Sequence, residues 1–271
     1  MKQTLIAFAF SMAFTVAQAQ MHQIPELKNL NWQMAPAVGK VGDKGEIKLA
    51  EPLMFLDAAD TNTFLQFHGN LPQTSSYTIT TKKGYWFGVL HFISDGYIKD
   101  DEKIDADALL ETLKEENIQG NEERRKQGLE TLILDDWYFP PRYDTETNRL
   151  EWGTKLRSEK DQSISVNVTT KILGKSGYIS AILVSSPESL DKDLVEFKQS
   201  LKNFDYVSGE KYSEWKEGDK VAAYGLGALV LGGAAAVATK KGGLKLIWLA
   251  ILAAGAAIWA VIKKLLNRNK D

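Results

Sequence analysis

Two long apolar stretches near the C-terminus constrain this chain more than any other feature. Residues 221–238 read VAAYGLGALVLGGAAAVA and residues 246–262 read LIWLAILAAGAAIWAVI. The second stretch has 17 residues without a charge. As an α-helix it would be about 26 Å long, close to the hydrocarbon thickness of a bilayer. We therefore expect a globular part followed by a transmembrane helical hairpin, with the lipid bilayer as one partner.

Small residues in the first stretch recur at every fourth position, at Ala228, Gly232 and Ala236. This spacing places them on one face of a helix, where a second helix can approach closely. We predict that this helix-packing face contacts the second stretch, another envelope or membrane protein, or a second copy of the chain.

The sequence leaves the number of spans open. Length and apolarity favour two spans, whereas the preference of Lys and Arg for the cytoplasmic side favours one. With one span, residues 246–262 would cross and the basic tail after them would be cytoplasmic. Residues 221–238 would then lie at the membrane interface.

The N-terminus predicts export. Lys2 precedes an apolar run from Leu5 to Val16, and Ala17-Gln18-Ala19 matches the small-residue cleavage pattern of a signal peptide. We expect residues 1–19 to be removed and residues 20–218 to form a domain in the bacterial periplasm, held at the inner membrane; the alternative is an uncleaved anchor. Because the chain has no cysteine, this domain is expected to fold without disulfides.

Charge is divided unevenly along the chain. The net charge is −2 overall, with about −9 on residues 20–218 and +6 on residues 219–271. An acidic domain is a poor match for phosphate backbones, so we expect no nucleic-acid partner. The basic tail suits lipid head groups instead.

The remaining pattern predicts an α+β fold, a mainly antiparallel sheet with two or three packed helices. Residues 84–93 are typical of a central strand, residues 20–44 look like a lead-in with one short helix, and Pro140 and Pro141 are expected to end a strand. Alternating apolar residues predict a meander over 148–156, 163–173 and 177–185, and helical spacing predicts helices over 61–68, 105–127 and 186–201.

Acidic residues concentrate in one segment, SDGYIKDDEKIDAD. Its Asp100, Asp101, Asp105 and Asp107, with Asp144 further on, are the candidate ligand or metal site, because hard cations bind converging carboxylates. The spacing does not match an EF-hand loop. The alternative is a solvated turn before a helix, whose N-terminus favours negative charge.

No catalytic centre is recognisable. The three histidines, His22, His68 and His91, lack metal-ligand spacing, and no cysteine or G-x-S-x-G serine supplies a nucleophile. We assign no catalytic residue and expect no cofactor.

Four blocks in order resemble a known family: GYIKDDEKIDADALLETLKE, PPRYDTETNRLEWGTKL, KILGKSGYISAILV and GDKVAAYGLGALVLGGAAAVA. They are similar to the domain-of-unknown-function family 2167, predicted bacterial membrane-anchored proteins. The resemblance implies an anchored architecture and brings no activity. Lys171 and Lys175 stand where an arginine is expected, so the charge is kept without the bidentate fork that favours anions.

Two functions follow. The first is a non-enzymatic interaction or scaffold protein of the cell envelope. The second is a ligand-binding protein or hydrolase with a carboxylate-based site around residues 100–107 and Asp144.

Overall fold

The structure is a computed structural model that describes residues 29–67, 74–83, 86–126, 131–185 and 187–233. The predicted signal peptide, residues 1–19, and the apolar stretch 246–262 lie outside the described residues. Among the helices that are described, none is both long and apolar enough to cross a bilayer.

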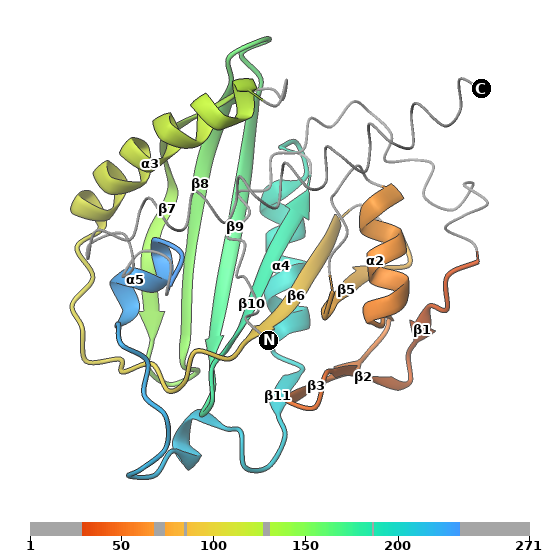
Figure 1. Cartoon of the computed structure of the whole chain (residues 1–271). Coiled ribbons are helices and arrows are strands. Elements are labelled where there is room, and N and C mark those ends of the chain that lie inside the picture. The colour runs from red at the N-terminus through yellow and green to blue at the C-terminus, as the bar shows by residue number, and fades with distance from the viewer. Residues whose placement is uncertain (1–28, 68–73, 84–85, 127–130, 186, 234–271) are drawn as a thin grey trace, which may run out of the picture.

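An antiparallel sheet of eight strands forms the centre of the domain (Figure 1), which confirms the expected α+β class. The predicted meander supplies three adjacent strands, and the predicted central strand pairs next to them. In spatial order the strands are β1 (Gln33–Met34), β4 (Leu53–Leu56), β5 (Ser76–Thr81), β6 (Trp86–Ile93), β10 (Tyr178–Ser185), β9 (Ile164–Leu173), β8 (Arg149–Ser158) and β7 (Leu132–Asp144).

A second sheet has three strands, in the order β11 (Phe204–Tyr206), β3 (Gly45–Leu49) and β2 (Ala37–Val41). Residues 33–34 and 37–41 form the strands β1 and β2, and the short helix expected in the lead-in is absent from the described residues 29–44. Pairing between residues 45–47 and 204–206 joins distant parts of the chain, which a local pattern does not reveal.

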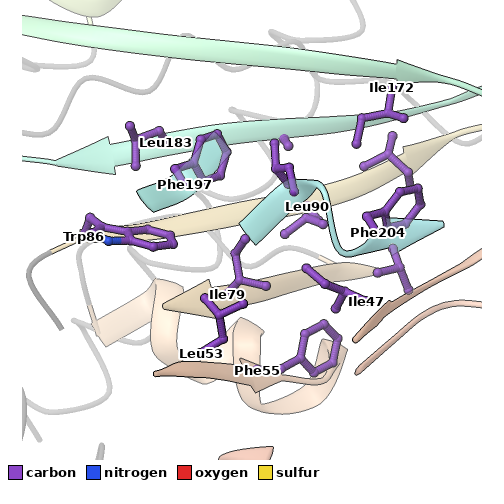
Figure 2. Close-up of a cluster of buried hydrophobic side chains, with 14 of the residues drawn as sticks. Ile47, Leu53, Phe55, Ile79, Trp86, Leu90, Ile172, Leu183, Phe197 and Phe204 are labelled. Carbon is purple, nitrogen blue, oxygen red and sulfur yellow. The ribbon is translucent and has the colours of Figure 1, made fainter. Parts of the chain in front are cut away.

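One face of the large sheet is covered by α4 (Leu190–Leu201) and by the small sheet; we call it the α4 face. Phe197 of α4 packs edge-on against Trp86 at 5.8 Å between ring centroids. Figure 2 shows side chains of the large sheet, α4 and the small sheet converging in this core.

The opposite face carries α2 (Ala58–Phe67), α3 (Ala106–Lys126) and α5 (Leu226–Val230), and we call it the α3 face. Phe64 of α2 packs on Phe87 of β6, and Leu109 of α3 belongs to the same cluster as Trp137 of β7. Both faces of the sheet are therefore partly covered by helices (Figure 1).

The helices α2 and α4 each begin directly after an N-cap residue, which shifts their first residues from the predicted positions. Asp57 Oδ1 accepts the N–H groups of Ala59 and Asp60 at 3.0 Å, so α2 begins three residues earlier than its apolar pattern suggests. The helix expected from residue 186 begins at Leu190, with Ser189 as its N-cap.

Strand β7 continues through Pro140 and Pro141 to Asp144, so the expected stop there is wrong. It lies at the edge of the sheet, where a residue without an N–H is tolerated, and its register is irregular between Phe139 and Arg142.

The described part of the first apolar stretch, residues 221–233, is not the continuous helix that the sequence predicts. Val221 pairs with Tyr97 in a parallel bridge, and α5 has only five residues. Gly232 follows in a turn with φ +100°, a conformation that favours glycine. Ala228 and Gly232 therefore do not form the predicted small-residue helix face, and Ala236 lies outside the described residues.

Candidate functional site

The segment that joins β6 to α3, residues 94–105, contains much of the predicted site. Asp105 Oδ1 accepts the N–H of Ala108 at 3.1 Å and caps α3. Asp144 Oδ1 accepts the N–H of Glu146 at 2.9 Å and its Oδ2 accepts the Thr147 hydroxyl at 2.7 Å, in the turn after β7. These hydrogen bonds lower the pKa of Asp144. Both carboxylates thus hold local backbone turns.

The other predicted carboxylates do not gather into a site. Asp100 Oδ2 accepts the hydroxyl of Tyr143 at 3.0 Å, whereas Asp101 and Asp107 are exposed. In the part of the chain that the structure describes, no three Asp, Glu, His or Cys side chains are arranged to hold a metal ion.

The same segment instead holds the end of the described chain, residues 211–233, which we call the C-terminal arm. The N–H of Tyr97 donates to the Lys220 carbonyl at 2.8 Å, and the N–H of Ala222 donates back to the Tyr97 carbonyl at 2.9 Å. The hydroxyl of Tyr212 donates to the Ile98 carbonyl at 2.7 Å. The arm includes the short 3₁₀ helix η1 (Tyr212–Glu214).

Aromatic stacking reinforces this backbone pairing. The ring of Tyr97 stacks on Tyr212 and on Trp215, with centroid distances of 4.5 and 5.0 Å. Burial raises the pKa of the Tyr212 hydroxyl, because the charged form would lose hydration. The arm is therefore attached through three packed rings as well as hydrogen bonds.

Two acidic residues that were not among the predicted site residues contact the arm directly. Glu102 accepts the N–H of Gly227 at 2.9 Å, and a Cβ on Gly225 would overlap the Glu102 carboxylate. Asp95 accepts the hydroxyl of Tyr224. The acidic segment thus holds the arm through side-chain hydrogen bonds. In the sequence, the two glycines of the arm, Gly225 and Gly227, are the signal for this close approach.

A row of polar residues crosses the middle of the α3 face. In register, Lys171 of β9 lies opposite Ser180 of β10, Ser180 lies opposite His91 of β6, and His91 lies opposite Ser76 of β5. Residues directly opposite in antiparallel strands point to the same face, so four adjacent strands contribute to one row. The sequence pattern placed Lys171 in a strand but gave no sign of this alignment.

Lys171 is the charged centre of the row. Its Nζ donates to Ser180 Oγ at 2.7 Å and lies over the rings of Tyr178 and Trp152, 5.2 and 5.8 Å from their centroids. Burial lowers the pKa of Lys171 to about 8, and the negative charge of Asp95 offsets this only in part. No carboxylate of the described residues forms an ion pair with it.

The pKa of His91 is sensitive to the positive charge of Lys171. Its Nδ1 lies 3.0 Å from the Ser75 carbonyl, which can only accept, so the neutral ring carries its proton on Nδ1. Burial lowers the pKa of His91, and the positive charge of Lys171 lowers it further. The ring is therefore neutral at pH 7.

Together these features define a class: an antiparallel α+β domain with a C-terminal arm fixed to one end of its large sheet. The chain belongs to the family described as "Protein of unknown function (DUF2167)", which it matches over residues 33–264. No curated protein matches it. A solution structure of cyanobacterial PsbP (CyanoP) from Synechocystis is similar at 11% identity and a TM-score of 0.36, over 65% of this chain and 92% of that chain. At that TM-score the likeness supports no further conclusion.

Proposed function

We propose that the chain is a non-catalytic binding or scaffold protein of the bacterial cell envelope. In this proposal the domain is periplasmic, and residues 246–262 hold it at the inner membrane. The observation that supports it best is the attachment of the C-terminal arm, because the chain leaves the domain from a fixed position on the sheet. Because the arm is attached to the sheet, the part of the domain from which the chain continues toward the membrane is fixed. Such an attachment would let a membrane-held protein present one surface to a partner in a defined orientation.

The arm favours one membrane span over two. Leu226, Leu229 and Val230 are buried against the domain, so they are not available to contact lipid. Residues 246–262 then form the single span, and the basic tail lies in the cytoplasm, as the positive-inside preference requires. The 12 residues from 234 to 245 can extend at most about 40 Å, which keeps the domain close to the bilayer.

The alternative, a hydrolase or ligand site built from carboxylates, has weaker support. Such a site needs Asp100, Asp105 and Asp144 to converge on one ligand. Asp105 and Asp144 are each bonded within their own turn, and Asp100 is bonded to Tyr143. A non-catalytic role agrees better with these positions.

Topology in intact cells tests the proposal. A reporter that is active only in the cytoplasm, fused after Asp271, should be active, while protease added to spheroplasts should digest the domain. The matched control is a chain that lacks residues 246–262, which should be released from the membrane fraction. A protected domain would contradict the export, and an inactive reporter with a digested domain would contradict the single span.

Cysteine cross-linking tests the binding role, because the native chain contains no cysteine. Two exposed apolar positions are suitable: Ile118→Cys on α3 and Val195→Cys on α4, which are 62% and 68% exposed. At least one variant should give discrete cross-linked products in intact cells, with the native chain as the unreactive control. Only uncross-linked chain from both variants would argue against a protein partner on these faces.

A further inference from the structure

We propose that Lys171 anchors a binding site on the α3 face for the carboxylate of a small organic acid. The site comprises Lys171 Nζ and the Ser180 hydroxyl as polar contacts, with the rings of Trp152 and Tyr178 beside them.

The first argument is an uncompensated positive charge. Six other lysines of the described chain form ion pairs with Asp or Glu, whereas Lys171 has only a neutral hydroxyl and two aromatic rings. A partly buried ammonium without a counter-ion is unfavourable for folding. The negative charge of Asp95, which acts on Lys171 without forming an ion pair with it, is hydrogen-bonded to Tyr224 in the arm. A bound anion would supply the missing charge.

The second argument is the chemistry around the ammonium. Nζ has three N–H donors and uses one of them on Ser180, so two remain for the oxygens of a carboxylate. The rings of Trp152 and Tyr178 lie next to the ammonium and are almost completely buried, so they fix its position and do not provide a surface for the ligand. The site would therefore recognise the carboxylate group itself.

The charge balance favours a carboxylate over a phosphate. The row contains a single fixed positive charge, because the neighbouring His91 is neutral at pH 7. Asp95 adds a negative charge nearby, which would repel a dianion more than a monoanion. A single lysine also lacks the planar fork with which arginine binds phosphate in two-point fashion.

Histidine NMR provides the test, since the chain has three histidines and His91 senses Lys171. The purified full-length chain would be titrated with benzoate, with neutral benzamide and inorganic phosphate as the matched alternatives. We expect benzoate to move the His91 ring signals and to raise its titration midpoint by about half a pH unit, because a negative charge offsets that of Lys171. Benzamide and phosphate should leave both nearly unchanged.

Variants separate binding from a purely structural role. Lys171→Met should abolish the response to benzoate, while Lys155→Met, which removes the same charge from the other face of β8, should keep it. The titration of the native chain stands on its own if Lys171→Met does not fold. The proposal is overturned if benzoate causes no shift at about 20 mM, the range of a weak charge-assisted contact. An equal response to benzamide or phosphate, or to benzoate in folded Lys171→Met, would also overturn it.

Discussion

The two faces of the large sheet are built differently. On the α4 face, apolar side chains from α4 and the small sheet fill the core. Two polar groups that enter it are paired: Trp86 Nε1 donates to Glu196 at 2.9 Å, and the Tyr206 hydroxyl donates to the Ile172 carbonyl at 2.6 Å. The Nε of Arg149, by contrast, is buried there without a hydrogen-bond partner. On the α3 face, a polar row with an unpaired ammonium lies between α2 and the elements α3 and α5. An ammonium without a counter-ion lowers stability, and this cost is the reason that we propose a binding role for the α3 face.

The largest predicted effect is on the α4 face. Phe197→Ala should lower the free energy of unfolding by about 3–5 kcal/mol, because it leaves a cavity between Trp86 and Gly88 in a fully buried core. Urea denaturation monitored by tryptophan fluorescence would measure the loss. Val195→Ala, on the exposed side of the same helix, should change stability by less than about 0.5 kcal/mol. Equal effects of the two variants would contradict the described core.

The attachment of the arm should have the next largest effect. Tyr97→Ala removes the ring that stacks on both Tyr212 and Trp215, and we expect a loss of about 2–3 kcal/mol from the two ring contacts and their burial. Limited proteolysis should then cleave within residues 211–233 at a lower protease concentration. The exposed neighbour Lys99→Ala is the control and should behave like the native chain. An arm that stays resistant in Tyr97→Ala would show that stacking does not hold it.

The free energy of unfolding should depend on pH because of Lys171, which lies on the α3 face. Its pKa is about 8 in the folded chain against 10.5 in the unfolded chain, so between these values the unfolded chain binds more protons and stability rises with pH. The gain should be about 1–3 kcal/mol, reduced from the full shift because the side chain is partly exposed.

Other groups near Lys171 also titrate, which makes a difference measurement necessary. Burial raises the pKa values of Tyr178 and Tyr224, so they lower stability as pH rises above 10. His91 stays neutral throughout this range, because burial and the positive charge of Lys171 lower its pKa. Thermal melts of the native chain and Lys171→Met at pH 7 and pH 10 would isolate the contribution, and identical pH profiles would refute it.

The cap of α3 should give a smaller effect. Asp105→Ala removes the acceptor for the Ala108 N–H and should lower stability by about 1 kcal/mol. Asp101→Ala, at an exposed position in the same segment, should change it by less than about 0.5 kcal/mol. The reverse ranking in chemical denaturation would mean that Asp101 has a role the structure does not show.

Calcium should have the smallest effect of all. The carboxylates of this segment are bonded to the backbone, to Tyr143 or to the arm, or are exposed, so millimolar calcium should leave the melting temperature unchanged. A clear rise would restore a metal site around Asp100 as a candidate.

The sequence predicted the parts of the fold that local pattern determines. The central strand at residues 86–93, the meander and the helix after Asp105 were all expected, because each has a clear period and a turn or capping residue at its end. Strand β5 was missed, since the short run SYTITT is rich in threonine and carries little apolar signal. The pairing of β3 with β11 in the small sheet was missed because it joins residues more than 150 positions apart.

Apolarity alone misjudged residues 221–233. Leu226, Leu229 and Val230 have the composition of a membrane segment, but the sheet offers them an apolar surface that a sequence pattern does not display. The candidate site was hidden for a related reason. Asp100 to Asp107 attract attention as a run of charge, whereas Lys171, Ser180 and His91 become neighbours only when three strands pair in register.

The parallel bridge between Tyr97 and Val221 also determines how the domain would respond to mechanical load. A pull on the chain beyond residue 233 first reaches the arm, and from there the two hydrogen bonds that join Tyr97 to Lys220 and Ala222. Tyr97 lies four residues after the end of β6, so tension would pass into an interior strand of the large sheet and bypass the short strand β11. The force would then act along the hydrogen bonds between interior strands. Unfolding would need these bonds to break together, because the force does not peel a strand from the edge of the sheet.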